Sequence, residues 1–307
     1  MNRPTNSYDA SANDAASHAN FSDAPRGPAY LKVFLTFARN SLIRDMTFRT
    51  NFILQCISST SWAFMNIGFY ELIFSHTHSI GADTGWGKDE FYVFLATTWL
   101  INSLVQAFFM PNVQEFSELI RTGNLDFALL KPIDTQFLIS FNKVDWSSLS
   151  NFGVGLLLLV YAALQLSERP ISPIDFGVVT IALYFFYLLC GVAILYSLMI
   201  ALAATSIWLG RNQSLYNFWF YITNFSRYPM EIYKTGYGLP LYYTFTFVVP
   251  VLIVVNIPAK VMAQPVATTP ESIVPLAVFA IFATLGSLLA SRWVFKRALL
   301  SYRSASS

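Results

Sequence analysis

The chain has 307 residues, of which 55% are hydrophobic and 12% are charged, whereas an average soluble domain has about 25% charged residues. The 19 Lys and Arg and the 17 Asp and Glu are too few to solvate the surface of a soluble protein of this size, so much of that surface faces something other than water. The 28 Phe and the two Cys exclude disordered, collagen-like and disulfide-scaffold classes, and the composition indicates a lipid-embedded protein.

Residues 1–28 are rich in Ser, Ala, Asn and Asp and contain no apolar run. This composition predicts a disordered polar tail. A secretory signal peptide needs a basic start and an apolar stretch of about 7–15 residues. Because this segment lacks the apolar stretch, we expect the first membrane span itself to direct insertion.

Residues 29–50 have the pattern of an amphipathic helix. Basic residues lie mostly off an apolar stripe, and a predicted membrane span follows within a few residues. The pattern favours a helix in the plane of an anionic leaflet over an ordinary surface helix packed on a soluble core. The stripe consists of Leu31, Phe34, Leu35, Ala38, Leu42 and Met46, and the basic residues are Lys32, Arg39, Arg44 and Arg49.

Several later segments are apolar and long enough to cross about 30 Å of hydrocarbon. They are residues 52–74, 91–112, 150–166, 176–204 and 273–293. Two further segments are ambiguous, because 215–225 is short and 239–257 is interrupted by Pro250 and closed by Pro258.

The charges that flank these segments predict the orientation of the chain. Basic residues exceed acidic ones before 52–74 and after 273–293, so both ends are predicted to be cytoplasmic. Acids predominate in the loop 75–90, which places this loop outside and the loop 113–149 inside. Because both ends lie on one side, the number of crossings is even, and we predict six.

Two arrangements give six spans. In the first, residues 205–228 form the fifth span and 229–258 form a re-entrant element outside, since non-helical backbone at membrane depth needs shelter by protein. In the second, residues 239–257 form the fifth span, which puts Arg227 and Lys234 on the favoured inner side. Charge alone slightly favours the second arrangement.

No catalytic constellation is recognisable in the sequence. Residues 81–88 superficially resemble a phosphate-binding loop, but Lys88 is followed by Asp89 instead of Ser or Thr. His76 and His78 are spaced like residues of a solvated polar loop rather than of a metal site. We therefore expect no enzyme activity, no cofactor and no metal here, and any ATP that drives this protein must bind to another chain.

Polar side chains inside the predicted spans mark a candidate translocation path. Asn66 lies in the first span, and Asn102 and Gln106 lie in the second. Such groups are costly in lipid, so they are expected to face protein or a water-filled path. Hydrogen bonding between helices is the commoner role of such residues, and it stays open for Asn66 and Asn102.

The inner loop 113–149 begins with a structured polar segment. Charged residues at a spacing of three face away from Phe116, Leu119 and Ile120, which predicts a short amphipathic helix stopped by Gly123. A second apolar turn, 125–130, ends at a Lys-Pro pair. Such a loop in so hydrophobic a protein favours docking to a cytosolic partner over merely capping the helix bundle. The residues concerned are Glu115, Glu118, Arg121, Gly123, Leu125, Asp126, Leu130, Lys131 and Pro132.

Several short motifs follow one another along the chain in a characteristic order. They are Phe48-Arg49-Thr50-Asn51, Gly123-x-Leu125-Asp126-x-x-Leu129-Leu130-Lys131-Pro132, Asp145 shortly before the third span, Arg227-Tyr228-Pro229 with Ile232-Tyr233, Pro250 with Pro258-Ala259, and Arg297-x-x-x-x-Tyr302-x-Ser304-Ala305-Ser306. In these motifs the sequence resembles the integral-membrane permease subunits of ABC-2-type ABC transporters, particularly a bacterial branch of uncharacterised permeases. The resemblance covers about residues 30–306.

The resemblance implies an all-α integral membrane protein with six transmembrane helices, an N-terminal interfacial amphipathic helix and a re-entrant element between spans five and six. That is the first of the two arrangements. The chain then divides into a tail (1–28), the interfacial helix (29–50), a six-span domain (51–296) with a cytoplasmic coupling loop (113–149), and a cytoplasmic tail (297–307).

The resemblance also implies a function. The chain is expected to be a permease subunit of the cell inner membrane, an exporter that pairs with itself or with a sister permease. Two cytosolic ATPase subunits are expected to bind the short helix at about 115–130 and to drive transport.

Two other functions compete with this one. An ion-gradient-driven secondary transporter needs charged coupling residues deep in several spans, and this chain has almost none. A membrane scaffold without transport also needs docking loops, so the sequence alone does not separate it from a permease.

Overall fold

The computed structural model describes residues 29–81, 84–170, 173–174, 176–209, 220–264 and 270–305. These residues form α-helices with short 3-10 and π-helical turns, and they contain no strand. The predicted tail 1–28 lies outside the described residues. An all-helical fold suits a lipid environment, because a helix satisfies its backbone hydrogen bonds within one segment.

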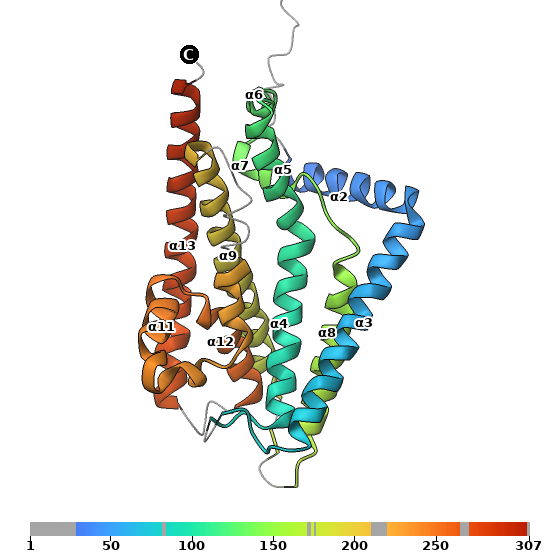
Figure 1. The fold of residues 1–307 in the computed structure, drawn as a ribbon, viewed down its shortest axis with the longest axis vertical. Coiled ribbons are helices and arrows are strands. Elements are labelled where there is room, and N and C mark those ends of the chain that lie inside the picture. The colour runs from blue at the N-terminus through green and yellow to red at the C-terminus, as the bar shows by residue number, and fades with distance from the viewer. Residues whose placement is uncertain are drawn as a thin grey trace, which may run out of the picture.

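The long helices run along one bundle (Figure 1). They are α3 (Arg49–Phe74), α4 (Lys88–Phe108), α8 (Leu149–Ser167), α9 (Val178–Leu209) and α13 (Pro270–Ala305). Four stretches are long and apolar enough to cross a membrane, namely Lys88–Arg121, Leu149–Ser167, Val178–Leu209 and Ile273–Tyr302. They coincide with four of the predicted spans, and the chain is a multi-pass membrane protein.

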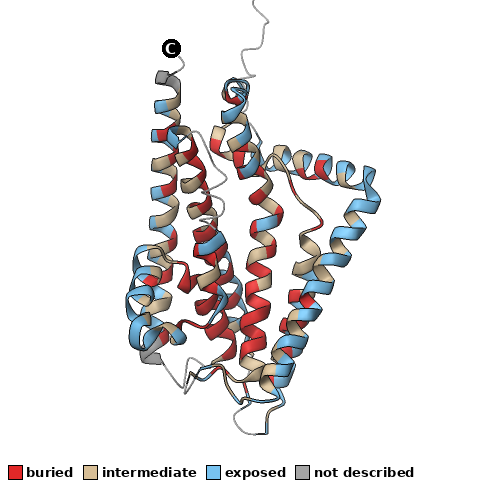
Figure 2. Cartoon of the chain, in the orientation of Figure 1, coloured by how far each residue is buried: buried red, intermediate tan, exposed pale blue. Residues whose placement is uncertain are grey.

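The helix α3 occupies the predicted first span but is less apolar than those four stretches. Its 26 residues are enough to cross a bilayer at about 1.5 Å per residue. Gln55, Asn66 and the hydroxyl-bearing run 58–61 lower its hydropathy. Only Ala63 is buried, and most of α3 is exposed in Figure 2. Its role as a span therefore stays a prediction.

The helix α2 (Tyr30–Thr47) lies crosswise to the long helices at one end of the bundle, which we call the α2 end (Figure 1). The predicted helix 29–50 is divided, because Phe48 leaves helical geometry with φ −105° and ψ 53° and makes an elbow. Arg49 on the far side of this elbow is exposed and begins α3.

Three shorter helices also lie at the α2 end. They are α5 (Met110–Arg121), α6 (Leu125–Leu129) and α7 (Thr135–Phe141). The predicted amphipathic helix is longer than expected, since α5 continues α4 after a single break and Pro111 sits in its first turn, where a missing N–H is tolerated. The helix ends beside Gly123, whose left-handed φ of +71° stops it as predicted.

The C-terminal segment differs from its prediction. Residues 297–305 continue α13 instead of forming a separate tail. The apolar pattern persists there, with Phe295 and Ala298 fully or almost fully buried, and so the helix does not end where the basic residues begin.

Ion pairs tie the helices together at the end opposite to α2. Lys88 of α4 contacts Glu71 of α3 at 2.5 Å. Arg169, in the connection after α8, contacts Asp89 at 3.0 Å and Glu90 at 2.5 Å. Asp89 and Glu90, two of the acids that predict an outer loop, therefore form ion pairs with a neighbouring segment, whereas Asp83 lies outside the described residues.

The segment between α9 and α13 is bent. Residues Gly236–Val248 and Leu252–Ala263 make two helical pieces at 87° to each other, which is either a broken span or a re-entrant element. The break begins at Val249, whose φ of −116° and ψ of 89° lie outside the helical region that a residue before proline disfavours. The bounds are η1 (Phe225–Arg227), η2 (Met230–Lys234), η3 (Gly236–Gly238), α11 (Leu239–Tyr243), η4 (Thr244–Val248) and α12 (Leu252–Ala263).

This bend confirms one sequence expectation and corrects another. The segment 239–257 is interrupted at Pro250, as the sequence predicted. Pro258 does not close the segment, since α12 continues through it to Ala263. Residues 210–219, the centre of the fifth span in the first arrangement, lie outside the described part of the chain.

The core lies around α4, which is the most deeply buried of the long helices in Figure 2. It packs against α8, α9 and α12, and α13 packs along α9. Gly155 of α8 lies close to the backbone of Ala96 in α4, so that a β carbon there would stand 3.4 Å from the carbonyl oxygen. This close packing holds α4 in the centre and leaves α3 at the edge.

Candidate functional site

The helices α5, α6 and α7 form a protrusion at the α2 end, which we call the α5–α7 unit. They enclose a cavity of about 320 Å³. Leu125 is completely buried and anchors α6, whereas Gly123, Asp126, Lys131 and Pro132 are exposed around it. The cavity is lined by Asn112, Glu115, Phe116, Leu119, Asn124, Phe127, Ala128, Lys131, Leu138, Ile139 and Asn142.

Asn112 holds the α5–α7 unit together from the inside. Its side chain is 2% exposed, and its amide donates to the carbonyl oxygens of Ser140 at 3.0 Å and Lys143 at 2.7 Å. Its Oδ1 atom accepts a hydrogen bond from the Lys143 backbone N–H at 2.7 Å. Buried, fully satisfied amide networks of this kind rigidify the backbone around them. Sequence reasoning missed Asn112, since an Asn in a polar segment gives no sign of its partners.

Glu115 also points inward. Its carboxylate contacts the Lys143 ammonium at 2.9 Å, and Asn142 donates to it at 3.4 Å. Glu115 is one of the charged residues predicted to contact a partner protein. In the structure it instead connects α5 to the segment after α7.

Glu118 and Arg121 point outward. They pair with each other through two hydrogen bonds, one of them from Arg121 Nε to Glu118 Oε2 at 2.8 Å, and their side chains are 55% and 68% exposed. Phe127 and Leu130, on and just after α6, are 70% and 80% exposed. Exposed apolar side chains beside charges are typical of a surface that binds another protein.

Arg292 of α13 joins the last long helix to the start of α7. Its guanidinium donates to Asp134 at 3.1 and 2.5 Å and to Gln136 at 2.6 Å. The Asp134 carboxylate also caps α7 by accepting from the Phe137 N–H at 3.0 Å. Hydrogen bonding from Arg292 holds the pKa of Asp134 below its ordinary value. Neither Asp134 nor Arg292 was singled out from the sequence, because 158 residues separate them.

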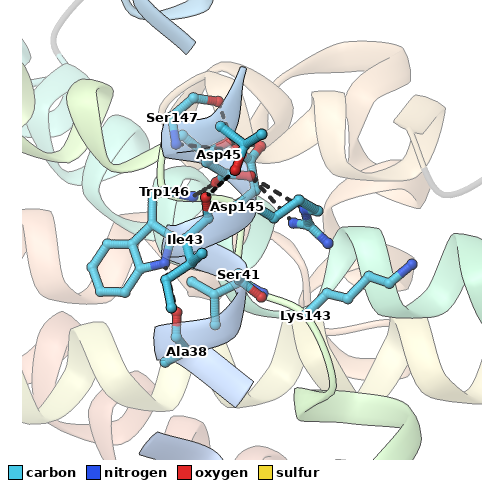
Figure 3. A network of polar contacts seen from close by, with 12 residues as sticks. Ala38, Ser41, Ile43, Asp45, Lys143, Asp145, Trp146 and Ser147 are labelled. Atoms are coloured by element: carbon cyan, nitrogen blue, oxygen red, sulfur yellow. Dashed lines mark hydrogen bonds and ion pairs between the residues drawn. The ribbon is translucent and has the colours of Figure 1, made fainter. Parts of the chain in front are cut away.

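Asp145, a motif position, organises the connection between α7 and α8 (Figure 3). Its carboxylate accepts hydrogen bonds from Ser147 at 3.0 and 2.6 Å and from Ser148, the residue before α8, at 2.8 Å. The next residue, Trp146, donates its indole N–H to the Ala38 carbonyl of α2 at 3.1 Å. The connection thus fixes α2 to the start of α8.

The predicted path residues are not brought together. Asn66 donates to the Trp62 carbonyl of its own helix at 2.8 Å, which satisfies it locally. Asn102 is half-buried on α4, and Gln106 is exposed and lines a polar cavity near the elbow of α2. Within the described residues, no hydrogen bond joins these three side chains.

A buried polar cluster lies at the opposite end. Glu231 of η2 pairs with Lys260 of α12, and it accepts a hydrogen bond from the Trp86 indole at 2.8 Å. The side chains of Glu231 and Lys260 are 14% and 7% exposed. Neither residue was singled out from the sequence, because they lie 29 positions apart and only the fold brings them together.

The Arg227-Tyr228-Pro229 motif leads into this cluster. Arg227 and Tyr228 are exposed, with the Arg227 guanidinium 5.4 Å from the centre of the Phe220 ring. Pro229 is buried, and the next N–H, that of Met230, donates to Asn256 of α12 at 2.8 Å. The motif therefore turns the chain onto α12.

Comparison with known proteins completes this picture. Residues 60–306 match the model of a family described as ABC-2 family transporter protein. The chain belongs to this family. The match to this ABC-2 family takes in the α5–α7 unit, Asp145, the bent segment and α13. No curated protein and no solved structure matches the chain.

Membership fixes the general role of this ABC-2 protein. It is the membrane component of a transporter, and the family associates with ABC ATPase subunits. In the described residues, no group of three or more His, Cys, Asp and Glu side chains is arranged to hold a metal.

Proposed function

We propose that this ABC-2 family protein is the permease subunit of an exporter, and that separate ATPase subunits dock on the outward face of its α5–α7 unit. One observation carries this proposal. The exposed Glu118–Arg121 pair and the exposed Phe127 and Leu130 side chains stand on a unit that buried contacts make rigid. Rigid, exposed surfaces of mixed polarity suit a docking partner.

The unit is also connected to the long helices. α5 continues α4 after one break, and Arg292 links Asp134 to α13. A push on the α5–α7 unit therefore moves the ends of α4 and α13 together, which changes access to a path between two permease copies. Partner motion of this kind needs two discrete arrangements of packed helices.

The proposal includes an orientation. The α2 end faces the cytoplasm of a cell with an inner membrane, because the basic residues of α2, α3 and α13 cluster there. Six spans result if α3 is the first and residues 205–228 form the fifth. The bent segment 229–263 is then a re-entrant element on the outer side, and its 87° bend suits that role.

The test is affinity purification of the tagged full-length chain with its ATPase from mild detergent. Glu118→Lys and Arg121→Glu each place two like charges together and are expected to release the ATPase chain and abolish stimulated ATP hydrolysis. Glu168→Lys, an exposed charge reversal in the connection after α8, is the matched control. Retention of the ATPase in both reversals would exclude this contact.

Recovery of the chain without any ATPase, in several detergents, would instead favour a gradient-driven transporter or a scaffold. Transport direction is tested separately, with inverted vesicles, since export from the cell appears there as ATP-dependent uptake of substrate into the vesicle lumen.

A further inference from the structure

A polar cavity lies at the elbow between α2 and α3. Its volume is about 440 Å³, which is within the range of about 300–1,000 Å³ that is typical of small-ligand sites. Three helices supply amide side chains to its wall: Asn51 and Gln55 from α3, Gln106 from α4 and Gln114 from α5. All four of these side chains are exposed, so their amide groups are accessible to hydrogen bond with a polar occupant.

The charges in the wall do not balance. Arg44, Asp45 and Asp145 line the cavity, so that carboxylates outnumber guanidinium groups. Arg44 pairs with Asp45 at 3.3 Å. Asp145 accepts hydrogen bonds only from neutral groups, and among the described residues no Lys or Arg forms an ion pair with it. Asp45 and Asp145 lie close together in Figure 3. The site therefore suits a cation.

The side chains next to the polar cavity indicate which other groups the ligand has. A second cavity of about 250 Å³ shares Arg44, Asp45, Asn51 and Gln55 and adds the rings of Phe48 and Phe52. Beyond them, α3 exposes Ile53, Leu54 and Ile57. From the elbow cavity along α3, the carboxylates and Arg44 are therefore followed by exposed apolar side chains. This order matches a ligand that has a cationic group, an adjacent anionic group for Arg44 and an apolar tail.

We propose that the elbow cavity binds the headgroup of a zwitterionic phospholipid that carries a primary ammonium, with the ammonium at Asp145 and the phosphate at Arg44. A primary ammonium donates three hydrogen bonds to carboxylate and amide oxygens, whereas a quaternary ammonium donates none. The acyl chains lie along the exposed face of α3. The bound lipid pins the elbow, and with it the angle between α2 and the bundle.

Native mass spectrometry of the delipidated full-length protein in detergent tests this. Phosphatidylethanolamine, phosphatidylcholine and phosphatidylglycerol with identical acyl chains are titrated separately. We expect phosphatidylethanolamine to bind about tenfold more tightly than phosphatidylcholine, which is the usual effect of a hydrogen bond to a charged group. Equal binding of these two lipids, or tighter binding of phosphatidylglycerol, would overturn the proposal.

Two variants locate the site. Asp145→Asn removes the unpaired charge and keeps acceptor and donor atoms for Ser147 and Ser148. Gln114→Trp fills the cavity from an exposed position whose side chain makes no hydrogen bond within the described residues. Both are expected to bring the ratio of the two affinities close to one, and Glu168→Gln, a remote charge removal, is expected to leave it unchanged. If Asp145→Asn does not fold, Gln114→Trp decides alone, and an unchanged preference in it rejects the site.

Discussion

Gly191 of α9 lies against the carbonyl oxygen of Val254 in α12, so that a β carbon at position 191 would stand only 2.7 Å from that oxygen. The reason lies four residues further along α12, at Pro258. Proline has no N–H, so the Val254 carbonyl loses its partner within the helix. Gly191 lets the backbone of α9 approach this free carbonyl, and the motif residue Pro258 and Gly191 form one packing unit.

We expect Gly191→Ala to destabilise the protein by about 1–3 kcal/mol, which is the usual cost of overpacking a tight contact. The matched control is Gly286→Ala in α13, where a new β carbon meets no atom within 4 Å. This control is expected to be neutral or to gain about 0.5–1 kcal/mol from helix propensity. Thermal unfolding in detergent measures both, and an equal response of the two variants would contradict the packing argument.

Removal of the Asp134–Arg292 contact is expected to change the acid sensitivity of the protein. Hydrogen bonding from Arg292 lowers the pKa of Asp134 from 3.8, so the contact stabilises the fold above that pH and is lost as the pH falls through the lower, folded value. Wild-type unfolding temperature should therefore decline more steeply between about pH 5 and pH 3 than that of Asp134→Asn.

Arg292→Gln is the companion variant, because it leaves the carboxylate but removes the largest of the interactions that lower its pKa. Its stability is expected to lose most of the same acid-dependent component, and the hydrogen bond from the Phe137 N–H keeps the rest. If Asp134→Asn leaves the slope unchanged, the pH dependence arises from another carboxylate.

Loss of one partner from the Glu231–Lys260 pair is expected to cost about 3–5 kcal/mol, because it leaves a buried charge uncompensated. Lys260→Met and Glu231→Gln are the single variants, and the double variant is expected to be more stable than either. Lys234→Met is the control, since this lysine is 40% exposed and 3.9 Å from Glu231. Denaturant unfolding of the wild type, the two single variants and the double variant gives the coupling energy between Glu231 and Lys260. If the free-energy changes of the two single variants simply add up to that of the double variant, the two side chains do not act as a pair.

Phe127→Ser and Leu130→Ser are expected to weaken ATPase binding about tenfold each without lowering the unfolding temperature, as for exposed contact residues at the centre of an interface. Leu125→Ala should behave in the opposite way. Its side chain is completely buried, so truncation is expected to cost about 2–5 kcal/mol of stability. Titration of the purified ATPase onto the reconstituted permease separates these effects, and unchanged affinity in both Ser variants would place the docking surface elsewhere.

Local sequence patterns predicted the parts of this structure that depend on neighbouring residues. Runs of apolar residues gave the helices at Leu149–Ser167 and Val178–Leu209, and a glycine with left-handed φ ended α5 at the expected place. Local patterns failed where two signals competed. Pro258 predicts a helix end, but α12 continues through it, and the Val254 carbonyl one turn earlier lies against Gly191 of α9.

The candidate site was predicted only in outline. The charged segment 115–132 was recognised, but its division into inward and outward residues was not. Glu115 faces Lys143 and Glu118 faces Arg121, and both are acids at the same helical spacing. The difference comes from the position of the segment after α7, which no pattern within α5 encodes.

By itself, the sequence determined that this is a membrane protein, that it is helical and that it resembles ABC-2 permeases. These properties follow from the composition, from the spacing of apolar residues and from short motifs, all of which can be recognised without knowing which residues are in contact. Only the tertiary structure decided that Asp134 meets Arg292, that Glu231 meets Lys260 and that a polar cavity opens at the α2 elbow. Each of these joins residues from separate helices, and the packing of the whole bundle sets which charges lie within hydrogen-bonding distance.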